Sequence, residues 1–256
     1  MNEELIVIAG PCAVESREQI NEIADQVREA GAHYLRAMIF KPRTNPKDFQ
    51  GIGLEGLGWI TEAKERTGMG LVTEVLDHTV LEEIVPYIDV LQIGSRNMQN
   101  QVLLNQAGEV MAEFPDKYVL IKRGNTSTMG EIKGAIRYLT DKGVNPENIW
   151  FCERGIQPSF TSCRNTFDIN IIPLLKEEGY QGKVIGDPSH ATGDPRLVIP
   201  IAKAAVAAGA DGLEIEVHNH PEKALCDGAQ SLLPEQFREL MGLVRAYQTF
   251  EAEYKK

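Results

Sequence analysis

The sequence predicts an α/β fold, a single (β/α)8 TIM barrel, and three observations support this. The chain has 256 residues, and one closed α/β barrel typically needs ~250. Eight short runs rich in Ile, Val, Leu or aromatic residues recur along it, with helical patterns between them. Strict alternation of strand and helix implies a parallel sheet with right-handed crossovers. We therefore expect the active site at the C-terminal ends of the strands.

The expected strands are spread along the whole chain. The segments between them carry apolar residues at three- and four-residue steps, as in Ser16–Ala30 and Thr79–Tyr87, which predicts helices there. The strands are expected at Leu5–Ala9, Tyr34–Phe40, Gly70–Val75, Asp89–Gly94, Tyr118–Arg123, Asn148–Cys152, Lys183–Asp187 and Gly212–Val217.

Start and stop signals flank these helices. Ser16 stands where an N-cap is expected, and Asn145-Pro146-Glu147 opens a turn. The stretch Leu197–Ala210 predicts a buried helix, and Gln236–Lys256 predicts a helix that closes the barrel. Glycines follow five of the helices, each just before a strand, at Gly31, Gly68, Gly143, Gly179 and Gly209.

An open doubly wound sheet is the alternative fold, because eight strands can also be divided between layers. It is disfavoured, since no GxGxxG loop follows the first strand, which runs instead into Ala9-Gly10-Pro11-Cys12. No linker or shift in composition marks a second domain. We expect one catalytic barrel over residues 1–256, with no added regulatory domain.

Composition excludes several classes of function. The formal net charge of −11 argues against a nucleic-acid partner, because phosphate backbones need a basic face. No basic n-region opens the chain, and no apolar run approaches the ~20 residues of a membrane span. The four cysteines lack CxxC spacing, which favours free thiols or ligands in a reducing cytoplasm.

Basic residues cluster where the expected strands end. Any one of them alone is also compatible with a solvated loop charge. Together they form a ring of like charge, which is tolerable only opposite anions such as phosphates and carboxylates. An acidic protein with a cationic mouth points to a substrate with several negative charges. The seven members of this predicted ring are Arg36, Lys41, Arg43, Arg96, Lys122, Arg123 and Arg154.

Four residues of metal-ligand type also follow strand ends, and they are Cys12, His190, Glu216 and Asp227. The first and last strands of a closed barrel are neighbours, so this group is expected to be compact. A set of thiolate, imidazole and carboxylate suits one divalent ion such as Mn, Fe, Co or Zn. Cys12 alone is equally compatible with a small buried core residue.

Seven motifs in order carry a resemblance to a known family. The sequence resembles the 3-deoxy-7-phosphoheptulonate (DAHP) synthases of the short β subtype of the type I family, and more distantly the 3-deoxy-octulosonate 8-phosphate synthases. The motifs are Ala9-Gly-Pro-Cys-Ala-Val-Glu-Ser16, Phe40-Lys-Pro-Arg-Thr44, Leu91-Gln-Ile-Gly-Ser-Arg-Asn-Met-Gln-Asn100, Ile121-Lys-Arg-Gly124, Cys152-Glu-Arg-Gly-Ile156, Asp187-Pro-Ser-His-Ala-Thr-Gly193, and Ile215-Glu-Val-His218 with Lys223-Ala-Leu-Cys-Asp227.

The resemblance implies an activity and a role for each matching residue. The implied reaction condenses phosphoenolpyruvate, erythrose 4-phosphate and water to 3-deoxy-D-arabino-heptulosonate 7-phosphate and phosphate, the first step of the shikimate pathway. Cys12, His190, Glu216 and Asp227 match metal ligands. Arg36, Lys41, Ser95, Arg96, Lys122 and Arg154 match the phosphoenolpyruvate site, and Arg43 and Thr44 the aldose phosphate site. Catalytic roles fall to Lys41, Lys122, His190, Glu74 and Glu153.

The chain departs from the family pattern at Ala37-Met38, at Asn45 and at Gln157-Pro158-Ser159, positions that concern the aldose channel. Two other functions therefore stay open: a synthase that uses another aldose phosphate, such as arabinose 5-phosphate, and a non-catalytic barrel that binds phosphorylated ligands. Lys41-Pro-Arg-Thr44 favours the four-carbon aldehyde. We expect a cytoplasmic homo-oligomer, a dimer or tetramer, with no nucleic-acid or membrane partner.

Overall fold

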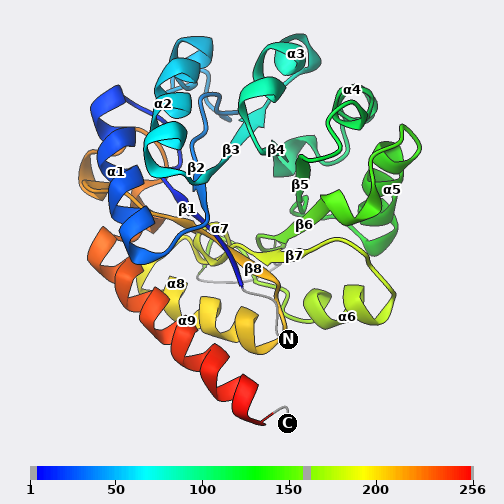
Figure 1. Ribbon diagram of the computed structural model, residues 1–256. Helices are drawn as coiled ribbons and strands as arrows, with labels where there is room; N and C mark the ends of the chain where they lie inside the picture. Colours follow the sequence, from blue (N-terminus) through cyan, green and yellow to red (C-terminus); the bar gives the residue numbers. More distant parts are fainter. Residues whose placement is uncertain (1–4, 158–162, 255–256) are drawn as a thin grey trace.

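A computed structural model describes residues 5–157 and 163–254 of the chain. Its parallel strands form a closed barrel in the order β1 to β8, and β1 pairs with both β2 and β8 (Figure 1). The predicted fold class is therefore confirmed. The strands are β1 (Ile6–Gly10), β2 (Tyr34–Arg36), β3 (Gly70–Val75), β4 (Val90–Ile93), β5 (Tyr118–Lys122), β6 (Ile149–Glu153), β7 (Val184–Gly186) and β8 (Gly212–Glu216).

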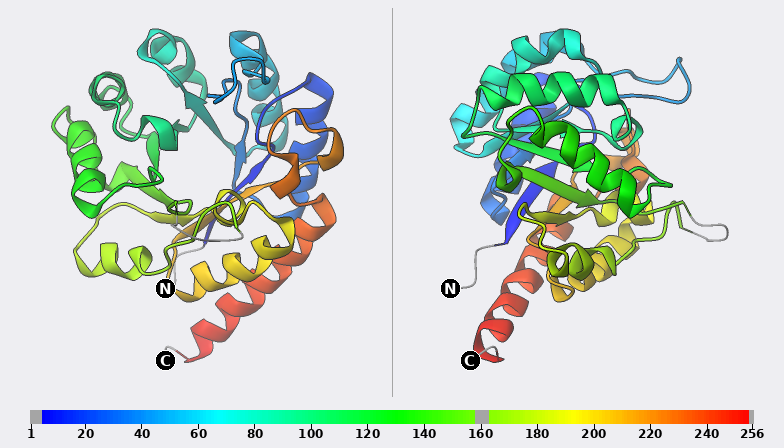
Figure 2. Two further views of the ribbon diagram at one scale, coloured as in Figure 1. Left: turned by 180° about the vertical axis from the view of Figure 1, so that it is seen from behind. Right: turned by 90° about the vertical axis from the view of Figure 1, so that its right-hand side faces the viewer.

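Helices surround the barrel on its outside, except the short helix α7, which carries His190 to the cavity (Figures 1 and 2). The long C-terminal helix α9 packs against α1 and α8, as the closing helix was expected to do. No helix within the described ranges is long and apolar enough to cross a membrane. The helices are α1 (Arg17–Ala30), α2 (Leu57–Thr67), α3 (Leu81–Ile84), α4 (Gln101–Ala112), α5 (Met129–Thr140), α6 (Ile171–Glu177), α7 (Pro188–Thr192), α8 (Pro195–Ala207) and α9 (Pro234–Tyr254).

The local signals in the sequence act as expected, with one exception. The Ser16 hydroxyl caps α1 by accepting a hydrogen bond from the Gln19 N–H, and Gly31 ends that helix with φ of 104°. The segment Thr79–Tyr87 is not one helix. It consists of the short helix α3 between two 3-10 turns, and α3 ends before Pro86, which has no N–H to continue the α-helical ladder.

Strand β2 is shorter than predicted, since Tyr34–Phe40 was expected and the strand ends at Arg36. Beyond it the chain bends away and bonds to loops: Met38 O accepts from Val14 N, and Ile39 O accepts from Gly53 N. These bonds carry the following segment to the mouth of the barrel. The other strand predictions agree with the structure to within one residue at each end.

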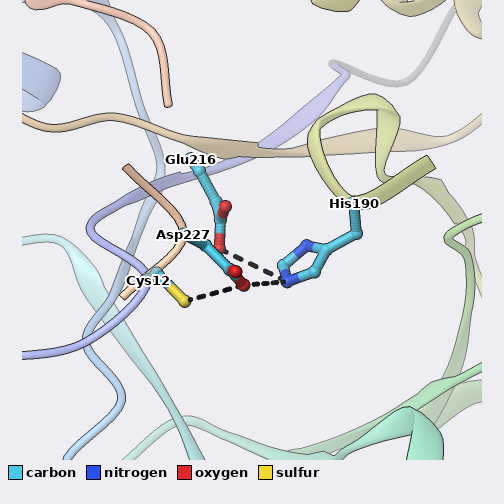
Figure 3. A group of neighbouring side chains, drawn as sticks. All are labelled: Cys12, His190, Glu216 and Asp227. Atoms are coloured by element: carbon cyan, nitrogen blue, oxygen red, sulfur yellow. Dashed lines mark hydrogen bonds and ion pairs between the residues drawn. The ribbon is translucent and has the colours of Figure 1, made fainter. Parts of the chain in front are cut away.

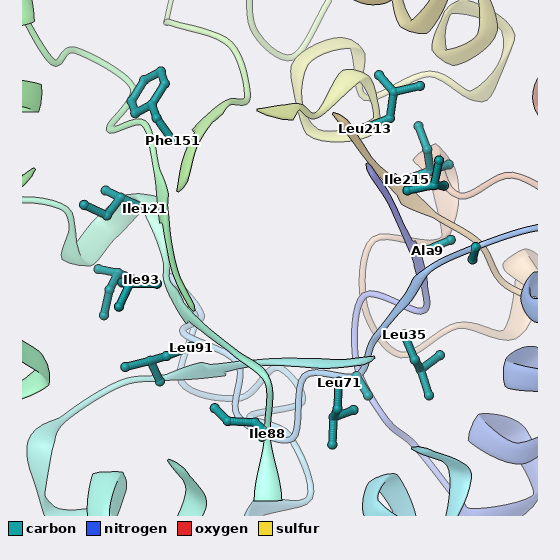
Figure 4. Packing of buried hydrophobic residues seen from close by; sticks show 14 of the residues in the cluster. Ala9, Leu35, Leu71, Ile88, Leu91, Ile93, Ile121, Phe151, Leu213 and Ile215 are labelled. Carbon is teal, nitrogen blue, oxygen red and sulfur yellow. The ribbon is translucent and has the colours of Figure 1, made fainter. Parts of the chain in front are cut away.

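Side chains alternate between the barrel interior and the helices, as the period of a β-strand requires. Outward residues such as Leu71, Leu91 and Phe151 form a continuous apolar layer under the helices (Figure 4). Inward residues divide into two zones along the barrel axis. The zone near the strand starts is apolar and aromatic, whereas the zone near the strand ends is charged. The apolar zone contains Ile8, Val72, Val90, Leu120, Trp150 and Ile185, and its cluster also includes Met38, which follows β2, and Cys152, near the end of β6.

Candidate active site

A cavity of about 480 Å³ opens at the C-terminal ends of the strands. Six of the seven predicted cations line it, namely Arg36, Lys41, Arg43, Arg96, Lys122 and Arg154. Ser95, Thr44, Glu74, His190 and Asp227 line it as well. The prediction that cations from separate strands meet at one mouth is therefore confirmed for these six.

Arg123 does not line the cavity, so its predicted place in the ring is wrong. Lys122 points into the barrel, and its neighbour Arg123 therefore points outward, where it contacts Glu153 (2.7 Å) and Asp168 (2.9 Å). Glu153, predicted to be catalytic, also lies outside the cavity and is fully buried. Its second carboxylate oxygen accepts the N–H of Gly155 at 2.7 Å.

The four predicted metal ligands converge at the edge of the cavity (Figure 3). One ligand atom from each lies within 4.8 Å of the other three. The His190 Nε2 atom is 3.3 Å from Glu216 Oε1 and 3.8 Å from Asp227 Oδ2, and Cys12 Sγ is 3.4 Å from the same Asp227 oxygen. Asp227 holds this position with φ of 48°, a left-handed backbone that is uncommon outside glycine.

The protonation of His190 suits a metal ligand. Burial lowers the pKa of His190, and this effect outweighs the nearby carboxylates of Asp187 and Glu216, which raise it. The ring is therefore neutral near pH 7. Asp187 orients it, because one carboxylate oxygen accepts the backbone N–H of His190 at 2.9 Å and the other lies 2.7 Å from the ring Nδ1. This leaves Nε2 directed at the other three ligands, as in carboxylate–histidine–metal sites.

The other ligand residues fit a divalent cation as well. Glu216 and Asp227 both have a lowered pKa: burial opposes ionisation in each, but His190 and nearby arginines more than offset it. Glu216 Oε1 is buried between the Arg36 guanidinium, 2.8 Å away, and His190 Nε2, 3.3 Å away. Burial and a hydrogen bond with Cys226 raise the pKa of the Cys12 thiol, so the thiolate needs a cation for its stabilisation. Two carboxylates, a neutral imidazole and a buried thiol form the donor set of a borderline divalent ion.

Two cations at the floor of the cavity are already paired. Arg36 is 99% buried and its guanidinium lies 2.8 Å from Glu216 and 3.3 Å from Glu214. Lys122 contacts Asp187 and lies 3.1 Å from Glu214. These carboxylates raise the pKa of both cations although burial opposes it, so both stay charged.

Arg154 differs from them, because no carboxylate pairs with it in residues 5–157 and 163–254. It is only 4% exposed, and its Nη1 donates to the amide oxygen of Asn125 at 2.5 Å. Burial, together with the nearby Arg164, lowers its pKa despite Asp187. A buried cation that lacks a counter-ion is costly, and an anion in the cavity would remove that cost.

The residues predicted for the aldose phosphate lie at the outer rim. Arg43 is 3.4 Å from Asp48, and Arg96 donates to Pro42 O (3.1 Å) and to the Thr44 hydroxyl (3.4 Å). The loop after β2 and the loop after β4 therefore build this rim together. Ser95 donates to Arg123 O at 2.6 Å, which fixes the β4 loop to the β5 loop.

Glu74 and Lys41 both line the cavity and are buried. Burial lowers the pKa of Lys41, but Cys12 and Glu74 more than offset this and raise it. Glu74 packs so closely on Gly94 that a Cβ atom there would lie 1.8 Å from its Oε1. The glycine at position 94 is thus required for the observed place of this carboxylate.

Several cavity residues were not predicted. The loops after β5 and β6 supply Asn125, Gln157, Arg164 and Asn165, and the β8 loop supplies Cys226. Arg164 lies far beyond the end of β6 in an irregular segment, so a prediction from strand ends does not include it. An arginine between two predicted motifs was the only available signal.

Comparison with known proteins places the chain in a family. The family model described as the DAHP synthetase I family matches residues 1–250. Phospho-2-dehydro-3-deoxyheptonate aldolase of Thermotoga maritima is 43% identical over 94% of this chain and 69% of its own length. Its crystal structure superposes with a TM-score of 0.88 at 42% identity, over 95% of this chain and 69% of that one.

Two further relatives are more distant or shorter. A truncated form of 3-deoxy-D-arabino-heptulosonate 7-phosphate synthase from Thermotoga maritima has a TM-score of 0.85 and 39% identity, over 95% of this chain and 86% of its own. A 2-dehydro-3-deoxyphosphooctonate aldolase of Nitratidesulfovibrio vulgaris is 31% identical, over 93% of this chain and 91% of its length. Since the family model spans nearly the whole sequence, the chain belongs to the DAHP synthetase I family.

Proposed function

We propose that this chain condenses phosphoenolpyruvate with erythrose 4-phosphate and water, and releases 3-deoxy-D-arabino-heptulosonate 7-phosphate and phosphate. The observation that carries the proposal is the buried guanidinium of Arg154, which has no carboxylate partner among the described residues, in a cavity lined by five other predicted cations. Such a cavity fits substrates that together bring two phosphates and a carboxylate. The 43% identical relative named as a heptonate aldolase favours erythrose 4-phosphate over a five-carbon aldose phosphate.

In this proposal each anionic group meets its own cations. Arg36 and Lys41 hold the carboxylate of phosphoenolpyruvate, while Ser95, Arg96, Lys122 and Arg154 hold its phosphate. Arg43 and Thr44 hold the aldose phosphate at the rim. Held this way, C3 of the enol phosphate faces the aldehyde carbon, so that a two-substrate encounter becomes an oriented one.

The chemical steps require groups that the cavity contains. C3 attacks the aldehyde carbon, positive charge develops at C2, water adds there, and the C2–O bond to phosphate then breaks. We propose that Glu74 orients that water and takes its proton. Of the two protons that the water loses, one ends on the former aldehyde oxygen and the other on the departing phosphate, which Arg154 and Lys122 stabilise. We propose Cys12, His190, Glu216 and Asp227 as ligands of one divalent ion (Mn, Fe, Co or Zn), whose chemistry when bound is Lewis acidity toward the aldehyde oxygen.

The biological setting follows from the same proposal. The reaction is the first step of the shikimate pathway toward aromatic amino acids. Cys12, Cys152 and Cys226 form no disulfide within the described ranges, which supports a reducing cytoplasm. We also propose that one barrel forms the whole catalytic unit and works as a homo-oligomer, a dimer or tetramer.

The test is an aldehyde panel with phosphoenolpyruvate, in which phosphate release is measured. We expect release with erythrose 4-phosphate well above that with arabinose 5-phosphate. The reverse preference would assign the chain to the octulosonate reaction. Binding of phosphoenolpyruvate without phosphate release from any aldehyde would instead identify a non-catalytic barrel.

A further inference from the structure

In Glu216 and Asp227, the two carboxylates of the candidate metal group, the two oxygens contact different neighbours. Glu216 Oε1 lies 3.3 Å from His190 Nε2, while Oε2 accepts a hydrogen bond from Gln230 Nε2 at 2.5 Å. Asp227 Oδ2 lies 3.4 Å from Cys12 Sγ, while Oδ1 lies 3.4 Å from Arg164 Nη1. One oxygen of each carboxylate thus faces the ligand group, and the other faces Gln230 or Arg164. Glu216 Oε1 also lies 2.8 Å from the Arg36 guanidinium.

Gln230 joins these two contacts into one network. It is 3% exposed, and its Oε1 accepts from Arg164 Nη1 at 2.7 Å. A carboxylate can only accept and a guanidinium can only donate, so the amide has one possible orientation. Glu216, Gln230, Arg164 and Asp227 therefore form a continuous chain of contacts behind the ligand atoms.

The backbone around Arg164 is bound to the segment that carries the imidazole ligand. Arg164 N donates to Thr192 O (3.1 Å), and Asn165 Nδ2 donates to His190 O (3.0 Å). On the other side, Gln230 N donates to Asp227 O at 3.2 Å within a single 3-10 turn. Both side chains are thus anchored to the elements whose ligands they contact.

We propose that Gln230 and Arg164 are positioning residues that fix which oxygens of Glu216 and Asp227 face a bound divalent cation. The inference rests on the proposed metal site, and neither residue is itself a ligand in it. Outer partners of this kind orient metal ligands, and their loss typically lowers metal affinity by about 10–100-fold. Arg164 also lines the substrate cavity, so it connects the anion site with the carboxylate ligands.

The test measures the Mn²⁺ affinity of the full chain by competition with a chelator. We expect Gln230→Met and Arg164→Met each to weaken Mn²⁺ binding about 10–100-fold, and Arg164→Lys, which keeps a donor, to recover part of it. The melting temperature of the metal-free Arg164→Met protein should stay unchanged, because that side chain is 39% exposed. The stabilisation that a fixed Mn²⁺ concentration provides should fall with the affinity.

Matched controls separate positioning from general damage. Gln26→Met removes a half-buried amide on α1, and Arg17→Met removes a surface ion pair with Glu62; both should leave Mn²⁺ affinity unchanged. If Cys12→Ala binds Mn²⁺ as well as the unaltered protein, the metal site itself is wrong. If Cys12→Ala loses Mn²⁺ while Gln230→Met and Arg164→Met keep full affinity, the site stands and the positioning role is overturned.

Discussion

The two halves of the barrel interior are built by the same strands and have opposite characters. Near the strand starts, Trp150 stacks on Tyr118 with ring centres 4.5 Å apart and meets Tyr34 edge-on at 5.5 Å. Near the strand ends, the inward positions hold Arg36, Lys122 and their carboxylate partners. Two residues along a strand are enough to pass from one half to the other.

This difference shows where stability and chemistry reside. Burying aromatic surface stabilises the fold, whereas burying ions costs free energy that their mutual attraction only partly returns. The apolar half therefore supports a charged half that is arranged for binding. Substitutions in the apolar half should lower stability and leave the kinetic constants intact. Substitutions in the charged half should change the kinetic constants and leave stability nearly intact.

The largest effect is expected from removing the metal or its thiol ligand. EDTA treatment or Cys12→Ala should abolish turnover, because the proposed metal supplies the Lewis acidity toward the aldehyde oxygen, while circular dichroism should show an intact barrel. Addition of Mn²⁺ should restore the EDTA-treated protein but not the variant at the same concentration. Full activity in metal-free protein would disprove the proposed ligand role.

In the apolar half, Trp150→Ala should lower the free energy of unfolding by about 3–5 kcal/mol, measured by urea titration. The Michaelis constants of the remaining folded protein should not change. Trp59→Ala, which removes a half-buried tryptophan from α2, is the control and should cost less. A changed Michaelis constant in Trp150→Ala would mean that the two halves are coupled.

In the charged half, Arg154→Met should lower kcat/KM for phosphoenolpyruvate roughly 100-fold, which corresponds to about 3 kcal/mol of lost transition-state stabilisation. Its stability should hold or rise, because a buried cation without a carboxylate partner is removed. Arg123→Met is the sharp contrast, since it leaves Glu153 buried and unpaired and should cost about 3–5 kcal/mol of stability. Equal destabilisation by both would contradict the distinction between paired and unpaired cations.

A smaller kinetic effect is expected at the rim. Arg43→Ala should weaken the binding of erythrose 4-phosphate by about 1.5 kcal/mol, because a charge-assisted phosphate contact is lost. Its Michaelis constant should rise accordingly. The constant for phosphoenolpyruvate should stay nearly unchanged. Steady-state kinetics with each substrate varied in turn provide the measurement, and equal effects on both would show that the two phosphate sites were confused.

The smallest effect concerns how the stability of the apolar half depends on pH in the alkaline range. Burial raises the pKa of Tyr34 from 10.0 to about 12, with contributions from Tyr118 and Asp89. The unfolded chain therefore loses this proton first, so the stabilisation is complete below pH 10 and is lost as pH rises toward 12. Tyr34→Phe should show a shallower fall in stability over that range, measured by urea unfolding. Parallel curves for the two proteins would rule out this contribution.

The fold was predictable because its signals are local and repeated. Apolar runs at eight places, helix caps such as Ser16, and glycines such as Gly31 each depend on a few neighbouring residues. The end of β2 was not predictable in this way. It depends on bonds from Val14 and Gly53, residues distant in sequence, which draw the chain out of the barrel.

The site was predictable where strand ends supply it. Alternation along β5 and β6 carries further information. Lys122 and Arg154 point inward, so their direct neighbours Arg123 and Glu153 must point outward. Treating each strand end as one cluster missed that distinction. Arg164 could not be located from the sequence, because the course of an irregular loop is set by contacts such as Arg164 N to Thr192 O.

The unpaired guanidinium of Arg154 also links substrate supply to the lifetime of the protein. A phosphate that binds there stabilises only the folded state and therefore reduces the fraction of molecules that open. Proteases in the cell act on opened molecules, so their access depends on that fraction. Molecules deprived of phosphoenolpyruvate should consequently be degraded faster than those that work at saturation. The abundance of the enzyme would then follow the availability of its own substrate without any dedicated regulator.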